Sequence, residues 1–269
     1  MIPESSALSP RTLIEAFLPL AGPTSLGVVY DTATAVGIDH HPLRLALRRM
    51  TAAGETEVSG RGRRAVARLT EVGRERLDRD RLGLRLALAQ DEGTVTWDGR
   101  WRLLAVSTPE AHRRERDALR RELTEAGAAK VSTGLFITPN DLGRMLTPSH
   151  WTTLVRAVAE QVDLGGVTDP LEITEMLWPA EPVLAGYRNL AHILEEVDGT
   201  ATLTPAEALV TQLRLAEALE QALRPDPLIP AVLRQGPWPA TAVRQSWRSC
   251  WTSLASRTDG AGLYQGWLP

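Results

Sequence analysis

The sequence has very little cysteine, since Cys250 is the only one among 269 residues. One cysteine cannot form an intrachain disulfide or a cysteine zinc cluster, so disulfide-rich secreted folds and cysteine zinc domains are excluded. No apolar run approaches the length of a membrane span, and no apolar stretch follows a basic start as in a secretion signal. We therefore expect a soluble cytoplasmic protein that does not insert into a membrane.

Aromatic residues are also scarce, at 5% of the chain, and they are unevenly placed. There are only two phenylalanines, so aliphatic side chains must fill most of the core, and all eight tryptophans lie at or beyond Trp97. Such a shift in composition, in a chain longer than a usual single domain, predicts two or three domains with a boundary near Trp97.

No signature of catalysis is present. The five histidines are scattered, no Ser, His and Asp arrangement can be tied together, and there is no G-x-x-x-x-G-K phosphate loop. Cys250 is interpreted as a small core residue rather than as a nucleophile. We therefore expect no enzyme activity and no bound metal or other cofactor.

The most informative stretch runs from Thr24 to Thr70. The expected elements are a helix over 24–36, a turn at Gly37, a second helix over 39–53 capped by Asp39, and two strands over 55–58 and 64–69 joined by a glycine and arginine tip. A further helix over 9–18 would form the hydrophobic floor beneath them. This order predicts an N-terminal winged helix-turn-helix, and therefore sequence-specific DNA binding.

Positive charge is concentrated in the same stretch. From His40 to Thr70 there are seven arginines and two glutamates, a local balance of +5 in a chain whose net charge is −3. The candidate DNA-binding residues are His40, His41, Arg44, Arg48, Arg49, Arg61, Arg63 and Arg64. We expect the helix arginines to read bases in the major groove and the hairpin arginines to hold phosphates or the minor groove. Thus Arg44→Ala should relax sequence preference, whereas Arg63→Ala should weaken all sequences alike; a merely solvated helix and hairpin is the alternative.

The middle of the chain predicts a small α/β unit. The expected elements are strands over 101–106 and 129–138 with a helix over 109–126 between them, an amphipathic helix over 151–162, and a strand or short helix over 171–177. A charge-dense helix over 71–85 would connect this unit to the N-terminal domain, with Gly73 and Gly83 as its weak points.

The last third of the sequence is mostly helical in pattern, with helices expected over 183–197, 205–223 and 240–256. The fold class is therefore α+β. The expected domains are a winged helix-turn-helix over 1–75, a connecting helix over 76–96, a central α/β domain over 97–180 and a C-terminal helical domain over 181–269.

A set of short motifs, in this order, resembles the PaaX family of bacterial transcriptional regulators. The motifs are Val36 to Asp39 with Leu43 to Met50, Gly60 to Arg64 with Arg68 to Thr70 and Gly73, Trp97 to Trp101, Leu119 to Leu123 with Gly127, and Asp226 to Pro230 with Trp238 and Pro239. The resemblance implies a winged helix, a central ferredoxin-like domain similar to the small CRISPR-associated nuclease subunit, and a helical C-terminal domain. It also implies a homodimeric repressor that releases its double-stranded operator, an inverted repeat, when an aromatic acyl-CoA binds.

Some positions depart from the family pattern. Ala67 stands where the family commonly has an aromatic residue, and Glu55 and Glu57 make the first hairpin strand more acidic than expected. Ser107 and Thr108 stand where the related nuclease carries a metal-binding aspartate, so nuclease activity is not expected.

An effector site is harder to place from sequence. The candidate ligand-binding residues, chosen as an apolar set with a few polar groups, are Trp178, Tyr187, Arg188, His192, Trp247 and Trp251. Arg188, Arg214 and Arg224 are cations that an acyl-CoA could use for its phosphates. Because Trp247 and Trp251 are one helical turn apart, core packing is an equally direct reading of that pair.

Two other function classes stay open. One is an RNA-binding or nuclease-like protein that uses the central domain, with Asp91, Glu92 and Asp98 as nearby carboxylates. The other is a protein-interaction adaptor whose winged domain packs on a partner. The operator, the effector and the direction of its effect are not specified by the residues.

Overall fold

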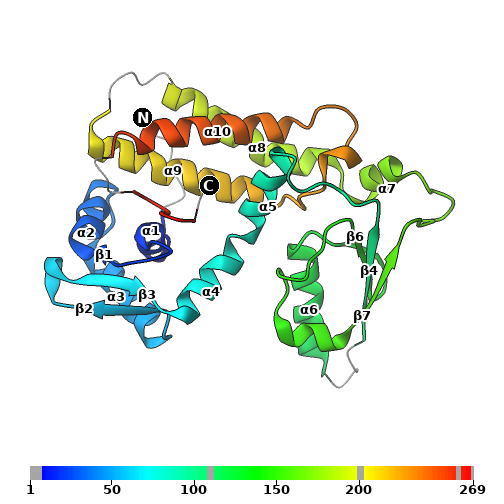
Figure 1. Cartoon of the computed structure of the whole chain (residues 1–269), viewed down its shortest axis with the longest axis horizontal. Helices are drawn as coiled ribbons and strands as arrows, with labels where there is room; N and C mark the ends of the chain where they lie inside the picture. Colours follow the sequence, from blue (N-terminus) through cyan, green and yellow to red (C-terminus); the bar gives the residue numbers. More distant parts are fainter. Residues whose placement is uncertain (1–7, 108–111, 199–202, 259–261, 268–269) are drawn as a thin grey trace. The chain divides into compact units, whose positions relative to one another are not determined.

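The fold is taken from a computed structural model (Figure 1), in which residues 8–107, 112–198, 203–258 and 262–267 are described. The chain divides into two compact units. Unit 1 comprises residues 1–81, 190–219 and 246–269, and unit 2 comprises residues 82–189 and 220–245. No helix in these described ranges combines the length and the apolar character that a membrane crossing requires.

Three short helices build the first part of unit 1. They are α1 (Pro10–Phe17), α2 (Leu26–Ala35) and α3 (His40–Ala52). The Ser9 hydroxyl caps α1 by accepting from the Thr12 N–H at 3.0 Å, and Pro10 fills the first turn, where no intrahelical donor is lost. Leu13 and Ile14 of α1 are fully buried, and α1 packs against both other helices. The helices expected over 9–18, 24–36 and 39–53 are therefore present.

A small antiparallel sheet follows α3 in unit 1. Its strands are β1 (Thr24–Ser25), β2 (Thr56–Ser59) and β3 (Val66–Leu69), in the order β1-β3-β2, and a 3-10 turn, η1 (Gly62–Arg64), separates β2 from β3. Ala65, Ala67 and Leu69 are buried while Arg64 and Arg68 are exposed, which is the alternation of a strand with one covered face.

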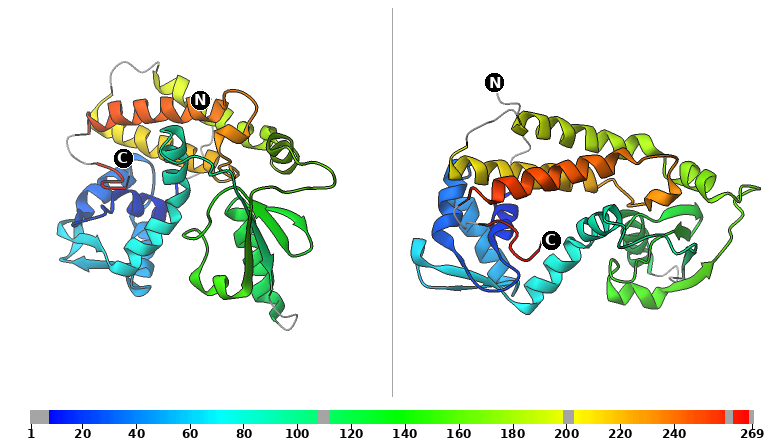
Figure 2. Two further views of the ribbon diagram at one scale, coloured as in Figure 1. Left: turned by 45° about the vertical axis from the view of Figure 1, so that its right-hand side comes forward. Right: turned by 45° about the horizontal axis from the view of Figure 1, so that its top comes forward.

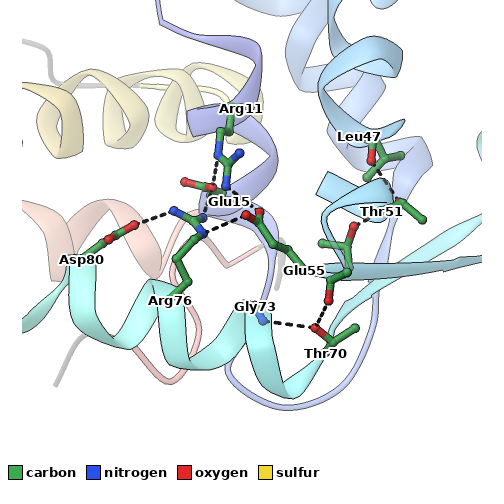
Figure 3. Close-up of polar contacts among 11 residues, drawn as sticks. Arg11, Glu15, Leu47, Thr51, Glu55, Thr70, Gly73, Arg76 and Asp80 are labelled. Atoms are coloured by element: carbon green, nitrogen blue, oxygen red, sulfur yellow. Dashed lines mark hydrogen bonds and ion pairs between the residues drawn. The ribbon is translucent and has the colours of Figure 1, made fainter. Parts of the chain in front are cut away.

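A charged network ties the next helix, α4 (Glu71–Asp80), to α1 and to the start of the hairpin (Figure 3). Arg11 donates to Glu15 at 2.7 Å and to Glu55 at 2.5 Å. Arg76 of α4 bonds to Glu15 as well and pairs with Asp80 at 2.6 Å. Glu15 and Glu55 are largely shielded from solvent, so these contacts are less screened than ordinary surface pairs.

The helix expected over 71–85 is interrupted, but at neither of its glycines. It breaks at Arg81, between α4 and α5 (Leu82–Asp91). The Arg81 side chain is buried over the rings of Tyr264 and Trp267, with its Cζ 4.7 and 4.4 Å from the ring centroids. Burial lowers the pKa of Arg81 to about 10. The break therefore lies where the Arg81 side chain packs on two aromatic rings, and not at the two glycines, whose helix propensity is low.

Unit 2 is built around a four-stranded antiparallel sheet. Its strands are β4 (Trp101–Val106), β5 (Ala129–Ser132), β6 (Leu135–Thr138) and β7 (Leu154–Ala159), in the order β5-β6-β4-β7. Helix α6 (Arg113–Glu125) covers one face, as Figure 2 shows. Leu119 and Leu123 of α6 pack there with Leu104, Phe136 and Leu154.

The opposite face of the sheet carries a second core. Trp101 and Ile137 of the sheet pack with Ile173 and Trp178, from the end of α7 (Pro170–Leu177), and with Leu233 of the 3-10 turn η4 (Ala231–Leu233). The rings of Trp101 and Trp178 are stacked, with centroids 6.3 Å apart and planes 3° from parallel. Of the two alternatives for residues 171–177, the helix is the one observed.

Two sequence predictions in unit 2 are wrong. Residues 129–138 form the β5–β6 hairpin rather than one strand, because Gly134 takes a positive φ of 89° in the turn. Residues 151–162 are not a helix: the 3-10 turn η3 (Pro148–Thr153) leads into β7, which pairs with β4 along its whole length. Val155 and Val158 suited a helical face by their spacing, yet both side chains are exposed.

Three long helices complete the fold. They are α8 (Ala180–Asp198), α9 (Pro205–Leu223) and α10 (Pro239–Ala255), close to the expected ranges. Thr204 and Glu207 cap α9 reciprocally: the Thr204 hydroxyl accepts from the Glu207 N–H at 3.3 Å, and the Glu207 carboxylate accepts from the Thr204 N–H at 2.8 Å. Each of the three helices contributes residues to both units.

Candidate nucleic-acid interface

Helix α3 has one buried and one exposed face. Leu43, Leu47 and Met50 are buried, whereas Arg44, Arg48 and Arg49 are exposed, as the sequence predicts. Asp39 precedes the helix with extended backbone, although its side chain makes no capping hydrogen bond. The buried stripe fixes α3 by packing against α1 and α2, which leaves the arginine face directed outward.

The arginines of this face are uncompensated. Among the described residues, Arg44, Arg48 and Arg49 form no ion pair or hydrogen bond through their side chains. The helix itself contains no acidic residue. Arg44 and Arg48 stand four residues apart, where like charges destabilise a helix by about 0.2–0.5 kcal/mol. The arrangement therefore costs helix stability and offers a cationic surface.

The two histidines at the start of α3 are placed differently. The His40 ring hydrogen-bonds through Nε2 to the Thr34 hydroxyl at 3.0 Å and to the Tyr30 carbonyl at 3.2 Å. Its ring also lies 5.1 Å from that of Tyr30. His40 thus joins α2 to α3, whereas His41 is exposed. Of the pair, His41 is the one whose side chain is open to a phosphate.

The hairpin tip has a second group of cations. Arg61 and Arg64 are exposed and have no side-chain partner within the described ranges. Arg63 differs, since it is paired with Asp31 of α2. Gly60 has a φ of 88°, and a Cβ atom there would lie 3.2 Å from the Cα of Ala65, so glycine suits this tight turn.

The acidic residues of the hairpin are both occupied by arginine. Glu57 of β2 accepts from two nitrogens of Arg68 on β3, at 2.9 and 2.6 Å. Glu55 faces Arg11 and Arg76. Both glutamates therefore have local counter-ions, and the acidity of the first hairpin strand does not neutralise the free arginines at its tip.

The six candidate ligand residues fall into different units. In unit 2, Trp178 is buried and donates through Nε1 to the Gly127 carbonyl at 3.0 Å. Tyr187 is also buried, and its hydroxyl donates to Asp226 at 2.8 Å; burial raises the pKa of Tyr187. Arg188 is exposed and paired with Glu181 at 2.7 Å.

The other three candidates belong to unit 1. Trp247 and Trp251 are buried and stacked, with centroids 5.1 Å apart, and Trp247 donates to the Leu215 carbonyl at 2.9 Å. His192 is exposed and lies 3.4 Å from Glu196. The two tryptophans thus take core positions in unit 1.

Sequence reasoning missed a buried ionic network in unit 2. Arg244 of α10 donates to both carboxylate oxygens of Asp91, each at 2.6 Å, and its Nη1 donates to the Tyr187 hydroxyl at 2.7 Å. Asp226 completes the network, and burial raises its pKa. No local sequence pattern predicts these contacts, because Asp91 and Arg244 are far apart in the chain.

Asp91 and Asp98, two of the carboxylates named for the nuclease-like alternative, are both paired with arginines. Asp91 is held by Arg244, and Asp98 accepts from both terminal nitrogens of Arg102, at 2.7 and 2.6 Å. Arg102 helps hold the pKa of Asp98 below its usual value. Within the described ranges, no group of three or more His, Cys, Asp or Glu side chains has a metal-binding arrangement.

Comparison with known proteins identifies the central segment. Residues 94–175 match the family described as the PaaX protein central Cas2-like domain. The predicted resemblance to the PaaX family is thereby confirmed, and the chain carries the central domain of that family. PaaX proteins are transcriptional regulators, so the match over this segment suggests a transcriptional regulator.

One solved structure resembles almost the whole chain. It is the "Uncharacterized protein Rv0674 from Mycobacterium tuberculosis", with 23% sequence identity and a TM-score of 0.60, over 94% of this chain and 99% of that one. This likeness shows the fold. No curated protein matches the sequence of the chain.

Proposed function

We propose that the protein is a sequence-specific DNA-binding regulator of transcription, whose N-terminal segment acts as a winged helix-turn-helix. In this proposal α3 enters the major groove and the β2–β3 hairpin is the wing. The observation that carries it is the pair of uncompensated arginine groups, Arg44, Arg48 and Arg49 on α3 and Arg61 and Arg64 at the tip. Phosphates and the acceptor edges of guanine are the groups such cations bind.

The proposal assigns separate tasks to the two groups. The arginines of α3 read bases, because a bidentate contact to guanine discriminates by about 1–3 kcal/mol. Arg61 and Arg64 hold the backbone and set affinity and its salt dependence. Arg63 contributes less than the sequence alone predicts, because Asp31 partly neutralises it.

The remaining parts of the proposal follow the family resemblance. The domains are the winged helix-turn-helix over 1–75, the connecting helix over 76–96, the central domain over 97–180 and the helical domain over 181–269. The protein acts in the cytoplasm as a homodimeric repressor on an inverted repeat. A small effector, such as an aromatic acyl-CoA, releases it from the operator. A dimer suits an inverted repeat, because one winged domain alone supplies little contact area.

Duplex binding by arginine variants tests the proposal. We expect Arg44→Ala to lose preference at one base pair of the selected site while keeping affinity for other sequences. We expect Arg64→Ala to weaken all duplexes alike and to reduce the salt slope by about 0.9. Arg121→Ala, which removes an exposed arginine on α6 without a described partner, is the matched control and should change neither quantity.

Two results would contradict the proposal. If Arg44→Ala and Arg121→Ala bind all duplexes as the unmodified protein does, α3 is not the reading helix. If the unmodified protein prefers RNA, or binds duplexes only weakly and without sequence preference, the RNA-binding or adaptor alternatives replace the regulator.

A further inference from the structure

Arg234 is a buried cation with two unpaired nitrogen donors. It follows η4 in unit 2, and only 7% of its surface is exposed. Its Nη1 donates to the Trp178 carbonyl at 2.6 Å, and its Cζ lies 4.4 Å from the centroid of the Trp238 ring. Its Nε and Nη2 atoms are buried and have no hydrogen-bond partner in the described part of the chain.

Such a group is unusual on physical grounds. An unpaired charge removed from water is costly, so buried cations are normally paired with carboxylates or coordinated by several acceptors. No carboxylate in the described ranges forms an ion pair with Arg234. Consistent with that isolation, burial lowers the pKa of Arg234, while Asp226 and Glu175 act on it only from a distance.

Arg244, in the same unit, is a buried arginine whose Nε and Nη2 atoms are both paired with a carboxylate. Its Nε and Nη2 atoms each donate to one oxygen of Asp91 at 2.6 Å, the two-pronged geometry that suits a planar carboxylate. The corresponding two atoms of Arg234 have no acceptor in the described part of the chain. Asp226 does not pair with them, because its oxygens accept from Tyr187, Leu228 and Arg244.

The elements beside Arg234 present apolar groups. Helix α7 packs against η4, and each carries an exposed large hydrophobic residue, Met176 on α7 and Val232 on η4. Trp238 is half-buried under the guanidinium. Thr174 of α7 adds a buried hydroxyl without a hydrogen-bond partner. Apolar side chains around a few unsatisfied polar groups are the usual composition of a small-molecule site.

We propose that Arg234 is the anion-binding residue of a site for a small apolar carboxylate. The two unpaired nitrogens of Arg234, Nε and Nη2, donate to the two carboxylate oxygens, and Trp238 with Met176 and Val232 contacts the apolar body of the molecule. As an effector site this rests on the proposed regulatory function; as a binding site it does not. It names the carboxylate as the chemical class that unit 2 recognises.

Calorimetric titration of the full chain tests the site. The probes are benzoate and hexanoate as apolar carboxylates, benzamide as the neutral analogue of benzoate, and inorganic phosphate as the other common oxyanion. We expect one saturable site for a carboxylate probe, with benzamide and phosphate binding at least tenfold more weakly. Absence of saturable carboxylate binding, or stronger binding of phosphate, overturns the proposal.

Variants locate the site. Arg234→Lys keeps the charge but lacks the two-pronged edge, and it should bind the carboxylate at least tenfold more weakly. Arg121→Lys alters an exposed arginine of α6 in the same unit and should bind the carboxylate unchanged. If Arg234→Lys does not fold, Trp238→Leu serves instead, since it keeps the guanidinium and removes the ring beneath it. Unchanged binding by the tested folded variant overturns the assignment.

The two proposals can fail separately. Duplex binding without carboxylate binding removes the site and leaves the regulator intact. Carboxylate binding that depends on Arg234, in a protein that does not bind duplex DNA, leaves the site and removes its role as an effector site.

Discussion

Gly73 lies so close to Glu55 that a Cβ atom at residue 73 would stand 2.0 Å from the Glu55 carbonyl oxygen. Gly73 is in the first turn of α4, where its N–H donates to the Thr70 hydroxyl at 3.1 Å (Figure 3). The same Glu55 carbonyl accepts from the Thr70 N–H at 3.0 Å. The absence of a side chain at Gly73 therefore lets α4 start directly against the base of the hairpin.

Gly73→Ala should accordingly destabilise the protein. We expect a loss of about 1–3 kcal/mol, as for overpacked sites, because backbone atoms rather than a flexible side chain must move. Gly83→Ala in α5 is the matched control: its nearest contact is Leu228 Cδ1 at 3.8 Å, and helix propensity should stabilise it by up to about 1 kcal/mol. Urea denaturation measures both. Equal changes for the two variants contradict the close contact at residue 73.

Asp31→Asn should strengthen duplex binding. The substitution removes the carboxylate paired with Arg63, so that Arg63 joins Arg61 and Arg64 as a free cation at the hairpin tip. One additional phosphate contact should steepen the salt dependence of log K by about 0.9. Glu181→Gln, which breaks the exposed pair with Arg188 in unit 2, is the control. Titration at several salt concentrations checks this, and an unchanged slope for Asp31→Asn counts against a DNA contact by Arg63.

Arg244→Met should be strongly destabilising. Removal of the guanidinium leaves Asp91 and Asp226 buried without their cation, and loss of one partner from a buried ion pair costs about 3–5 kcal/mol. Arg188→Met removes an exposed arginine from unit 2 and should leave stability unchanged. Urea denaturation of both variants measures the difference. Similar stability of the two would mean that the Arg244 network does not stabilise unit 2.

Glu122 should make unit 2 sensitive to acid. Burial disfavours the charged carboxylate, but hydrogen bonds from Thr147, at 2.7 and 2.6 Å, and from His150 outweigh it and hold the pKa of Glu122 below its usual value of 4.5. A lowered folded-state pKa gives stabilisation that is complete above the unfolded-state pKa and is lost as the pH falls through the folded-state value.

The advantage of the unmodified protein over Glu122→Gln should therefore be constant above about pH 5 and shrink below pH 4.5. Glu125→Gln, on the exposed side of the same helix and without a described partner, should show no such trend. Urea denaturation between pH 3 and pH 7 checks this. A gap that stays constant down to pH 3 contradicts a lowered pKa for Glu122.

Local periodicity explains which parts of the fold could be predicted. The burial of Leu43 and Leu47 opposite Arg44 and Arg48 is readable from sequence, because a helix repeats every 3.6 residues. The same reasoning failed at β7, where Val155 and Val158 have helical spacing but lie on opposite faces of a strand. Pairing with β4, a segment some fifty residues earlier, decided the structure there.

Side-chain partners were the least predictable part of the candidate site. The sequence places Arg61, Arg63 and Arg64 side by side, yet only Arg63 is paired, and its partner Asp31 lies in a different element. The unpaired Nε and Nη2 atoms of Arg234 have no sequence signal either, because they depend on Trp178 and Trp238 both contacting the same guanidinium. Such contacts are set by tertiary structure and have no periodicity to read.

Selection of bound fragments from genomic DNA, with purified protein at two salt concentrations, tests the central claim most directly. The account predicts an enriched inverted repeat that remains enriched at the higher salt, with overall affinity reduced because the release of counterions is less favourable there. Binding that is equal for all fragments and disappears at the higher salt would contradict it, because the arginines of α3 would then act only as a general cationic surface.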